Sequence, residues 1–463
     1  MRGAPRGGNH LAVSEAESYH VSANWQVEDR FGGKLPPSAD VVIIGGGIVG
    51  VSTAWFLAKR GLHVVLCEKG AVACEQSGRN WGWVRQQGRD PRELPMMIES
   101  RRIWQELEHE IGEDVGFAEC GCLFLASDED EIEHFERWLP IAKEHDLDTE
   151  IISGEQLDLQ VMHGGARWPA ALYTASDCRA EPHKAAPAIA RAAGRAGADI
   201  LTRCAVRGIE TSAGRVSAVV TEHGPIRAGA VLCAAGAWTG MFCRSLDIPL
   251  PQLRVRGTVA RTAAAPKLFN GCVFDARLGI RRRQDGGYTI AHGAVLDHPI
   301  TPTTLRYAFK FLPALKQEWR VLRLSLGREF IEELRTPSKW PLDRPSPFET
   351  RRVLNPAPNP KVLAGIEQNL AAVFPALAGT PLVETWAGIV ETTPDVVPII
   401  GEEPGLPGFY VATGLSGHGF GIGPGAGKAI AALIAGENSG IDLSPFRRER
   451  FFDGSPIEPM RSV

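Results

Sequence analysis

A run of glycines directly after a buried strand restricts the fold of this 463-residue chain more than any other feature. Val41–Ile44 is a continuous β-branched run, which is typical of a strand buried on both faces of a parallel sheet. Gly45–Gly50 follows it, Ile48–Lys59 shows the apolar spacing of a helix, and His63–Glu68 is a second apolar strand. This order predicts a βαβ unit within an α/β fold.

The glycine run has the spacing G-x-G-x-x-G at Gly45, Gly47 and Gly50. The first glycine allows a tight turn, the second lets a pyrophosphate approach the backbone closely, and the third lets the helix pack closely on the strand. Glu68 ends the second strand at the offset where an acid binds ribose hydroxyls, and an acid there disfavours a 2′-phosphate. The pattern predicts a dinucleotide site made by Gly45, Gly47, Ile48, Val49, Gly50, Glu68 and Lys69.

Two later strands are expected to join the same sheet. Ala230–Ala235 and Phe409–Thr413 are apolar runs, each followed by glycine. Distant parts of the chain therefore contribute to one domain. We assign residues 39–90, 166–255 and 371–446 to a nucleotide-binding domain. Residues 91–165 and 256–370 are assigned to a substrate domain with a mixed sheet. Residues 1–38 are expected to form an N-terminal arm, and residues 447–463 a C-terminal tail.

Composition favours a small-molecule partner. The 50 basic and 54 acidic residues are mixed along the chain, so no basic face for nucleic acid or anionic lipid is expected. No apolar run reaches the roughly 18 residues of a membrane span, and the first forty residues lack the apolar core of a secretion signal. The nine scattered cysteines suit free thiols in a reducing cytoplasm, and no metal site is predicted.

Several further motifs occur in order along the chain. They are Ser77–Asn80 (SGRN), Ala234–Trp238 (AAGAW), Trp386–Gly388 (WAG) with Thr393–Asp395 (TPD), and Gly414–Gly421 (GLSGHGFG). Together with the glycine run, they resemble the FAD-dependent family that includes D-amino acid oxidase, glycine oxidase and sarcosine oxidase. The resemblance covers residues from about 39 to 446.

This resemblance implies a Rossmann-like FAD-binding domain assembled from discontinuous segments. It also implies oxidation of a C–N bond of an amino acid, N-alkylamino acid or amine by hydride transfer to the flavin, giving an imine that hydrolyses. FAD is expected to be non-covalent, since no cysteine follows Cys272 and the loop Ser77–Val84 has no histidine. Beyond the glycine run, the resemblance implies FAD contacts at Ser77, Gly78, Arg79, Asn80, Trp81, Gly82, Val206, Ala235, Gly236, Trp238, Gly388, Gly417, His418, Gly419, Phe420 and Gly421. Backbone N–H groups and a helix beginning near Pro424 are expected to stabilise the flavin's pyrimidine end.

The sequence departs from the family where a substrate carboxylate is held. Glycine oxidases carry an arginine soon after the Trp-Ala-Gly segment, where this chain has Val390 and Glu391. Sarcosine oxidases use an arginine after the Ser-Gly-Arg-Asn loop and a lysine in the late glycine segment. Arg85 matches the first, but Gly421 stands at the second.

Arg85 is therefore the leading candidate to bind a carboxylate through its planar guanidinium. Of the run Arg281–Arg283, only one or two side chains can point inward from a strand. His418 is a candidate catalytic base, although a flavin-contacting role is favoured for it. The candidate substrate residues are Arg85, Trp83, Arg281, Trp386 and Glu391.

Alternative functions stay open at this stage. The chain could be the FAD-binding subunit of a heteromeric amine dehydrogenase, or an NAD-dependent dehydrogenase with the same βαβ unit. Thr289 stands where sarcosine oxidases place a lysine that helps oxygen react, so the acceptor is O2 or another oxidant. The substrate's identity and stereochemistry, the oligomeric state and the role of the arm stay open.

Overall fold

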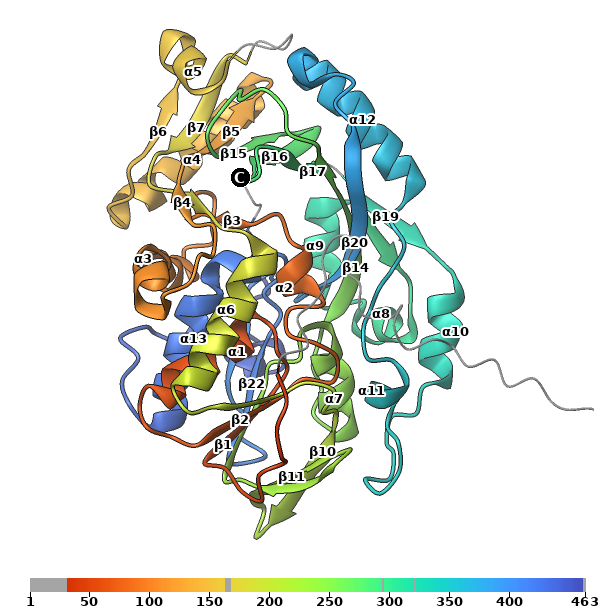
Figure 1. Ribbon diagram of the computed structural model, residues 1–463. Coiled ribbons are helices and arrows are strands. Elements are labelled where there is room, and N and C mark those ends of the chain that lie inside the picture. The colour runs from red at the N-terminus through yellow and green to blue at the C-terminus, as the bar shows by residue number, and fades with distance from the viewer. Residues whose placement is uncertain (1–30, 163–167, 294, 320, 461–463) are drawn as a thin grey trace, which may run out of the picture.

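The computed structural model describes residues 31–162, 168–293, 295–319 and 321–460 (Figure 1). Most of the predicted N-terminal arm and the last three residues of the predicted tail lie outside this part of the chain.

The predicted βαβ unit is present as β1 (Val41–Ile44), α1 (Ile48–Ala58) and β2 (Val64–Cys67). β1 and β2 pair in parallel, with Val41 opposite Val64, and all eight strand residues are buried. The sheet of the described residues has six strands in the order β21-β22-β13-β1-β2-β9. Its other members are β13 (Ala230–Cys233), β22 (Phe409–Thr413), β9 (Asp199–Leu201) and the antiparallel edge strand β21 (Ile399–Glu402).

Helices cover one face of this sheet. α1 packs between α6 (Pro182–Arg195) and α13 (Gly419–Ala435), and α13 also packs on α3 (Leu94–Ile111). On the other face, apolar residues of β10 (Val206–Ser212) and β11 (Arg215–Thr221) join a second buried cluster, with β12 (Gly224–Arg227) completing their small antiparallel sheet. The predicted α/β fold is confirmed.

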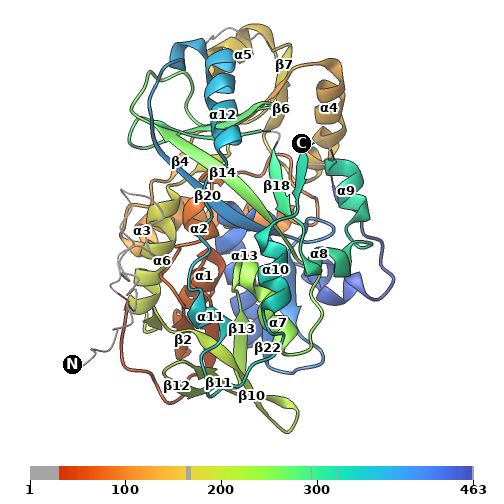
Figure 2. The same cartoon turned by 90° about the vertical axis from the view of Figure 1, so that its right-hand side faces the viewer.

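A larger mixed sheet forms the other half of the molecule. Its order is β19-β18-β14-β17-β16-β15-β5-β7-β6, with β20 paired along β14. The long antiparallel pair β14 and β20 runs from one half to the other (Figure 2). The bounds are β5 (Cys122–Ala126), β6 (Thr149–Ile152), β7 (Ala170–Thr174), β14 (Leu253–Thr262), β15 (Cys272–Asp275), β16 (Leu278–Arg282), β17 (Tyr288–His292), β18 (Leu296–Pro299), β19 (Leu322–Ser325) and β20 (Leu382–Thr392).

Shorter elements connect the two halves. β3 (Trp83–Val84), β8 (Cys178–Arg179) and β4 (Ala118–Glu119) form a small antiparallel sheet. The other α-helices are α2 (Gln76–Arg79), α4 (Glu129–Glu144), α5 (Gly154–Gln160), α7 (Thr239–Ser245), α8 (Pro302–Tyr307), α9 (Leu312–Glu318), α10 (Arg328–Arg335), α11 (Pro347–Thr350) and α12 (Pro360–Val373).

The two halves share segments more closely than the predicted domain bounds suggest. β7 and β20 come from ranges assigned to the nucleotide-binding domain, but both are strands of the large sheet. α3, from a range assigned to the substrate domain, packs on α13. α3 supplies apolar residues to the main cluster of the nucleotide-binding half, whereas Ala171 of β7 and Trp386 of β20 pack against residues of the large sheet. The domain bounds stay a prediction.

The helix expected near Pro424 begins earlier, at Gly419, and Pro424 lies inside it. A proline there lacks an N–H and disturbs the local hydrogen-bond ladder. Ser100 of α3 bridges the Gly421 carbonyl and the Gly425 N–H, one turn apart in α13. Its Oγ donates to the carbonyl at 2.6 Å and accepts the N–H at 3.0 Å. A neighbouring helix thus supplies the bridge that lets α13 continue past its proline.

Among the described residues, no helix is both long enough and apolar enough to cross a membrane.

Ser100→Ala should destabilise the protein, because it leaves the buried Gly425 N–H without this acceptor. We expect a loss of about 1–3 kcal/mol in the free energy of unfolding, measured by urea unfolding with FAD present. Ser127→Ala, at an exposed serine, is the control and should change stability by less than about 0.5 kcal/mol. Equal effects of the two variants would contradict the bridge.

Candidate functional site

One cavity of about 980 Å³ extends from the glycine run to the large sheet. Residues of β1, α1, β2 and the turn after β13 line one end, and residues of β3, β5, α4, β18, α8 and α9 line the other. The loop after β22 and the strand β20 lie between the two ends. An elongated ligand that contacts both halves fits this shape.

The glycines of the first turn are required by close backbone contacts. Gly45 has a φ of 112°, and a Cβ there would lie 2.5 Å from the Ala234 carbonyl oxygen. A Cβ on Gly50 would lie 2.1 Å from the Gly45 oxygen. Gly47 is the N-cap of α1, which has no side-chain cap, and it faces the cavity. The helix N-terminus is therefore open to a phosphate.

Glu68 joins the end of β2 to the glycine run. Its Oε2 accepts the Gly46 N–H at 2.7 Å, and its Oε1 accepts the Gly70 N–H at 2.7 Å. Each carboxylate oxygen keeps a lone pair for a ribose hydroxyl. Burial raises the pKa of Glu68, although Lys69 and the two N–H groups oppose the shift. The residue can serve both the loop and a ribose.

Trp238 closes the nucleotide end. Its indole Nε1 donates to Glu75 Oε1 at 2.9 Å, and the Lys69 ammonium lies 3.9 Å from its ring centroid. Val206, at the start of β10, and Gly236, after β13, also line this end of the cavity. These residues are suited to bind the adenosine half of a dinucleotide.

The Ser-Gly-Arg-Asn loop is held by its own side chains. Ser77 Oγ accepts the Ile48 N–H at 2.8 Å, beside the glycine run. Arg79 is buried and donates from Nη1 to the Ala387 carbonyl at 2.8 Å, which ties α2 to β20. Asn80 Nδ2 donates to the Ser77 carbonyl. The loop is thereby fixed between the nucleotide end and β20.

The late glycine segment leads into α13 at the cavity. Gly417 has a φ of 86°, and His418 is the N-cap of the helix. A Cβ on Gly421 would lie 3.0 Å from the Trp83 carbonyl oxygen. This close contact between α13 and β3 means that a side chain at position 421 would require one of the two segments to shift. The N-terminus of α13 presents a positive dipole end to the cavity.

A buried ion pair lies behind His418. Arg89 Nη1 donates to Glu93 Oε2 at 2.9 Å, and both side chains are almost fully buried. His418 Nδ1 is 3.6 Å from the same Oε2. Burial lowers the pKa of His418 more than Glu93 raises it, so the imidazole is held neutral. Burial alone would raise the pKa of Glu93, but His418 and Arg89 hold it below its usual range.

Arg85 reaches the substrate end of the cavity. Its guanidinium carbon lies 5.2 Å from the centroid of the Phe124 ring, and Nη1 donates to the Gln87 carbonyl. Asp177 is close enough for Arg85 to lower its pKa, but burial dominates and raises that pKa to about 6. The Asp177 carboxylate accepts the backbone N–H groups of Gln86 and Gln87.

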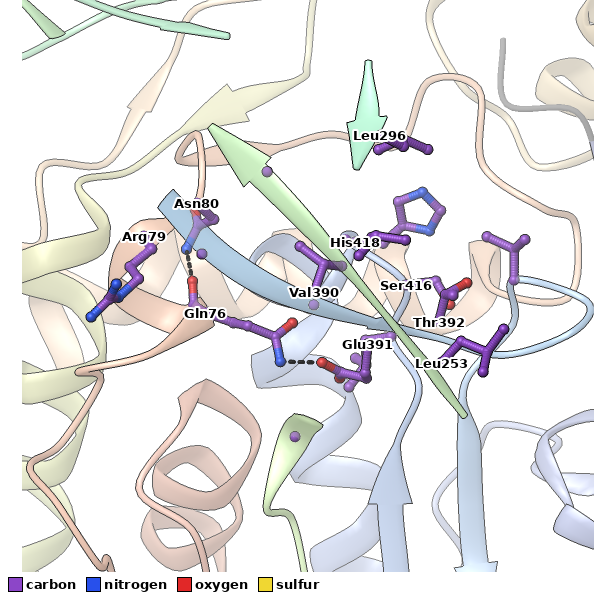
Figure 3. A pocket seen from close by; sticks show the side chains of 18 of the residues that line it. Gln76, Arg79, Asn80, Leu253, Leu296, Val390, Glu391, Thr392, Ser416 and His418 are labelled. Atoms are coloured by element: carbon purple, nitrogen blue, oxygen red, sulfur yellow. Dashed lines mark hydrogen bonds between the residues drawn. The ribbon is translucent and has the colours of Figure 1, made fainter. Parts of the chain in front are cut away.

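Alternation along β20 separates Val390 from Glu391. Figure 3 shows Val390 on the same side of the strand as His418, and Glu391 on the opposite side with Gln76. Glu391 is buried and accepts a hydrogen bond from Gln76 Nε2. Burial raises its pKa to about 7, although Gln76 and the Leu415 N–H oppose the shift. Glu391 therefore lies nearer to Gly236 than to Arg85.

Two predicted substrate residues have other partners. Arg281 is fully buried and forms two hydrogen bonds of 3.0 Å with the Glu181 carboxylate. Trp386 donates from Nε1 to the Arg79 carbonyl at 2.9 Å. Neither residue lines the cavity. Both instead tie the large sheet to the loop that follows α2.

The structure brings most of the predicted residues to one cavity. Trp83, Arg85 and Glu391 line it from the predicted substrate set. Gly50, Gly78, Gly82 and Gly421 lie behind its surface. The predicted FAD residues that line it are Gly45, Gly47, Ile48, Val49, Glu68, Lys69, Ser77, Arg79, Asn80, Trp81, Val206, Ala235, Gly236, Trp238, Gly388, Gly417, His418, Gly419 and Phe420.

Sequence reasoning missed several site residues. Arg89 lies in the loop before α3 and Glu93 is the N-cap of that helix, so helical spacing could not indicate their ion pair. Gln76 directly precedes the Ser-Gly-Arg-Asn motif. Phe124 and Met460 line the cavity without any local motif, because only the tertiary fold brings them there.

Comparison with known families gives one assignment over most of the chain. The family described as "FAD dependent oxidoreductase" (DAO) matches residues 40–433. Human mitochondrial sarcosine dehydrogenase is 26% identical over 431 residues, which are 90% of this chain and 42% of that protein. The chain thus spans less than half the length of this relative. The glycine oxidase of Geobacillus kaustophilus is 26% identical over 90% of this chain and 99% of its own length.

A solved structure agrees more closely. The L-amino acid deaminase of Proteus myxofaciens, solved in complex with anthranilate, is 32% identical and superimposes with a TM-score of 0.89. The match covers 93% of this chain and 97% of the deaminase.

Gly47→Val should abolish FAD binding, because the added side chain enters the phosphate end of the cavity. Glu68→Ala should weaken FAD binding by about 1.5–3 kcal/mol, the scale of hydrogen bonds to a charged group. Fluorescence titration of the apoprotein with FAD measures both effects, and Glu155→Ala, at an exposed glutamate, is the control. Equal losses in the Gly47 and Glu68 variants would refute the assigned roles.

Glu391→Gln should change the pH dependence of stability. The buried Glu391 carboxyl, with its pKa raised to about 7, binds a proton in the folded protein at pH values where the unfolded chain has released it. Its contribution to stability is therefore lost as the pH rises through 7. Relative to the wild type, apo Glu391→Gln should gain up to roughly 3 kcal/mol between pH 5 and pH 8.5, measured by urea unfolding. Glu367→Gln, at an exposed glutamate, should show no such gain, and a pH-independent difference for Glu391→Gln would exclude the shifted pKa.

Proposed function

The chain belongs to the DAO family of FAD-dependent oxidoreductases, and from this premise we propose that it oxidises the C–N bond of an amino acid or N-alkylamino acid. The family match confirms FAD as the cofactor and replaces the NAD alternative. When bound, FAD supplies a two-electron acceptor for hydride. What the chain's own side chains contribute is the binding and orientation of the substrate.

The proposal rests on the contacts of Arg85 in the cavity. Other cations on the cavity wall of the described chain have partners that occupy them: Arg89 pairs with Glu93, and Arg79 binds backbone carbonyls. Arg85 has a backbone carbonyl and the face of Phe124 as its partners. Its planar guanidinium retains donors for a carboxylate, and charge-assisted contacts of this kind are strong.

Aromatic and apolar side chains surround Arg85. Trp83, Phe124, Phe135 and Phe274 line the same end of the cavity, with Leu296 beyond them. Their exclusion of water strengthens a carboxylate–guanidinium contact and favours a substrate with an apolar side chain. The related deaminase, solved with anthranilate, supports this choice, since anthranilate combines a carboxylate, an amine and an aromatic ring.

In this proposal, His418 accepts the proton that the substrate ammonium must lose. Its imidazole is held neutral, and its Nδ1 faces Glu93, which leaves Nε2 to exchange a proton with the amine. With the amine neutral, the α-carbon can lose a hydride, for which bound FAD would be the acceptor, and the nitrogen lone pair forms an iminium; hydrolysis by water then gives an oxo acid and an ammonium or alkylammonium ion. Val390 lies on the same side of β20 as His418 and is uncharged, so it adds no charge to this part of the cavity.

An anaerobic screen tests this function. Both enantiomers of the common amino acids, their N-methyl derivatives and simple amines are mixed with the oxidised protein, and bleaching of the flavin absorbance is recorded. Bleaching by carboxylate-bearing amines supports the proposal, and bleaching only by amines without a carboxylate overturns it. Admission of O2 or of an artificial acceptor to the reduced protein then separates an oxidase from a dehydrogenase.

Arg85→Lys should impair substrate binding, because lysine keeps the charge but loses the planar fork. We expect a lower kcat/KM, corresponding to a loss of about 1–3 kcal/mol in transition-state stabilisation. Most of the change should be a higher KM. The flavin spectrum should be unchanged. Arg282→Lys, at a partly exposed arginine that ends β16 and does not line the cavity, is the matched control. Normal turnover by the Arg85 variant would show that Arg85 does not bind the substrate carboxylate.

A further inference from the structure

The segment after α13 returns to the site at its substrate end. We define residues 447–460 as the C-terminal strap. It contains one short 3-10 helix, Arg448–Phe451, and no helix or strand from 452 to 460. Side-chain contacts, rather than a backbone ladder, must therefore hold its last residues in place.

The start of the strap is fixed to the FAD half. Arg450 is buried and donates from Nε and Nη2 to the Asp395 carboxylate at 2.8 and 3.0 Å. A third bond, from Nη2 to the Val397 carbonyl, is 2.8 Å long. Asp395 belongs to the Thr-Pro-Asp motif that follows β20. The strap thus begins from a rigid position beside the site.

Two basic side chains guide the strap further. Lys310, between α8 and α9, donates to the Phe451 carbonyl, and its ammonium lies 4.7 Å from the centroid of the Phe452 ring. Arg92, next to the buried Glu93, donates from Nη2 to the Glu458 carbonyl at 3.0 Å. The strap is therefore tied to both sides of the cavity, at α8–α9 and at the start of α3.

Met460 is the strap residue that reaches the cavity. It lines the cavity wall and packs against the apolar cluster that contains Phe124 and Phe135. Phe124 is the ring over which the Arg85 guanidinium lies. Met460 is consequently at the end of the cavity where Arg85 would hold a carboxylate, away from the glycine run.

We propose that Met460, held by the C-terminal strap, forms a wall of the substrate chamber and sets the size of the substrate side chain. This inference rests on the proposed function. Methionine is flexible and polarizable, so it adapts to an apolar substrate better than the fixed aromatic rings around it. Since this wall stands on a segment outside the sheets, its side chain can change without disturbing the FAD half.

Size-changing variants test the wall. Met460→Ala should raise the ratio of kcat/KM for tryptophan to that for alanine at least tenfold, and Met460→Trp should lower it at least tenfold, with FAD content unchanged. Rates of anaerobic flavin reduction by the reactive enantiomers give the ratio. Met162→Ala, at an exposed methionine that does not line the cavity, should leave it unchanged. An unchanged ratio in both Met460 variants would overturn the proposal.

A second measurement does not depend on turnover. A chain ending at Gly454 keeps the Arg450 and Lys310 contacts but lacks Met460, so iodide should quench its bound FAD at least twofold more efficiently than in the wild type. Equal quenching would mean that the strap does not close the chamber. If no amino acid reduces the wild-type flavin, the proposed function fails, while the quenching result still decides the place of the strap.

Discussion

Close contact between α13 and its neighbours brings an early and a late segment of the chain to one site. Glycines at alternate positions of this helix meet different partners: a Cβ on Gly423 would lie 2.7 Å from Ile48, and one on Gly427 would lie 2.5 Å from Ser52. A Cβ on Gly425 would lie 2.4 Å from the Met96 carbonyl oxygen of α3. Larger residues would push α13 away from α1 and α3. His418 and the glycine run share a cavity because this packing places both helix N-termini beside it.

A buried ion pair then connects the two halves, and a second one holds the C-terminal strap. Arg281 of the large sheet binds Glu181 at the N-cap of α6, and Arg450 binds Asp395 beside β20. Removing one partner of such a pair would leave an uncompensated charge, which is more costly than losing an exposed pair. The same argument explains why Arg281 is unsuited to a substrate carboxylate. Its charge is already matched, whereas Arg85 has a carbonyl and an aromatic ring as partners.

The nucleotide half could be predicted from local sequence because its requirements are local. Gly50 and Glu68 act through backbone geometry within one βαβ unit, and their observed contacts match the spacing. The substrate half depends on pairing between distant segments. Which of Arg281–Arg283 faces inward, or whether Glu391 shares a side with Val390, is set by the register of β16 and β20. The early start of α13 was missed for a similar reason, since Ser100 from another helix compensates for Pro424.

This division suggests how one fold accepts different amines. Backbone N–H groups and tightly packed glycines form the FAD end, and few substitutions there can be tolerated. At the other end, Val390, Gly421 and Arg85 come from three separate segments, and two of these positions differ from the relatives whose pattern the chain otherwise follows. A Cβ on Gly421 would lie 3.0 Å from the Trp83 carbonyl oxygen, so a side chain there would require β3 or α13 to shift. On the proposal that Arg85 binds the carboxylate, the anchor comes from the segment after β3, and substrate selectivity comes from the walls around it.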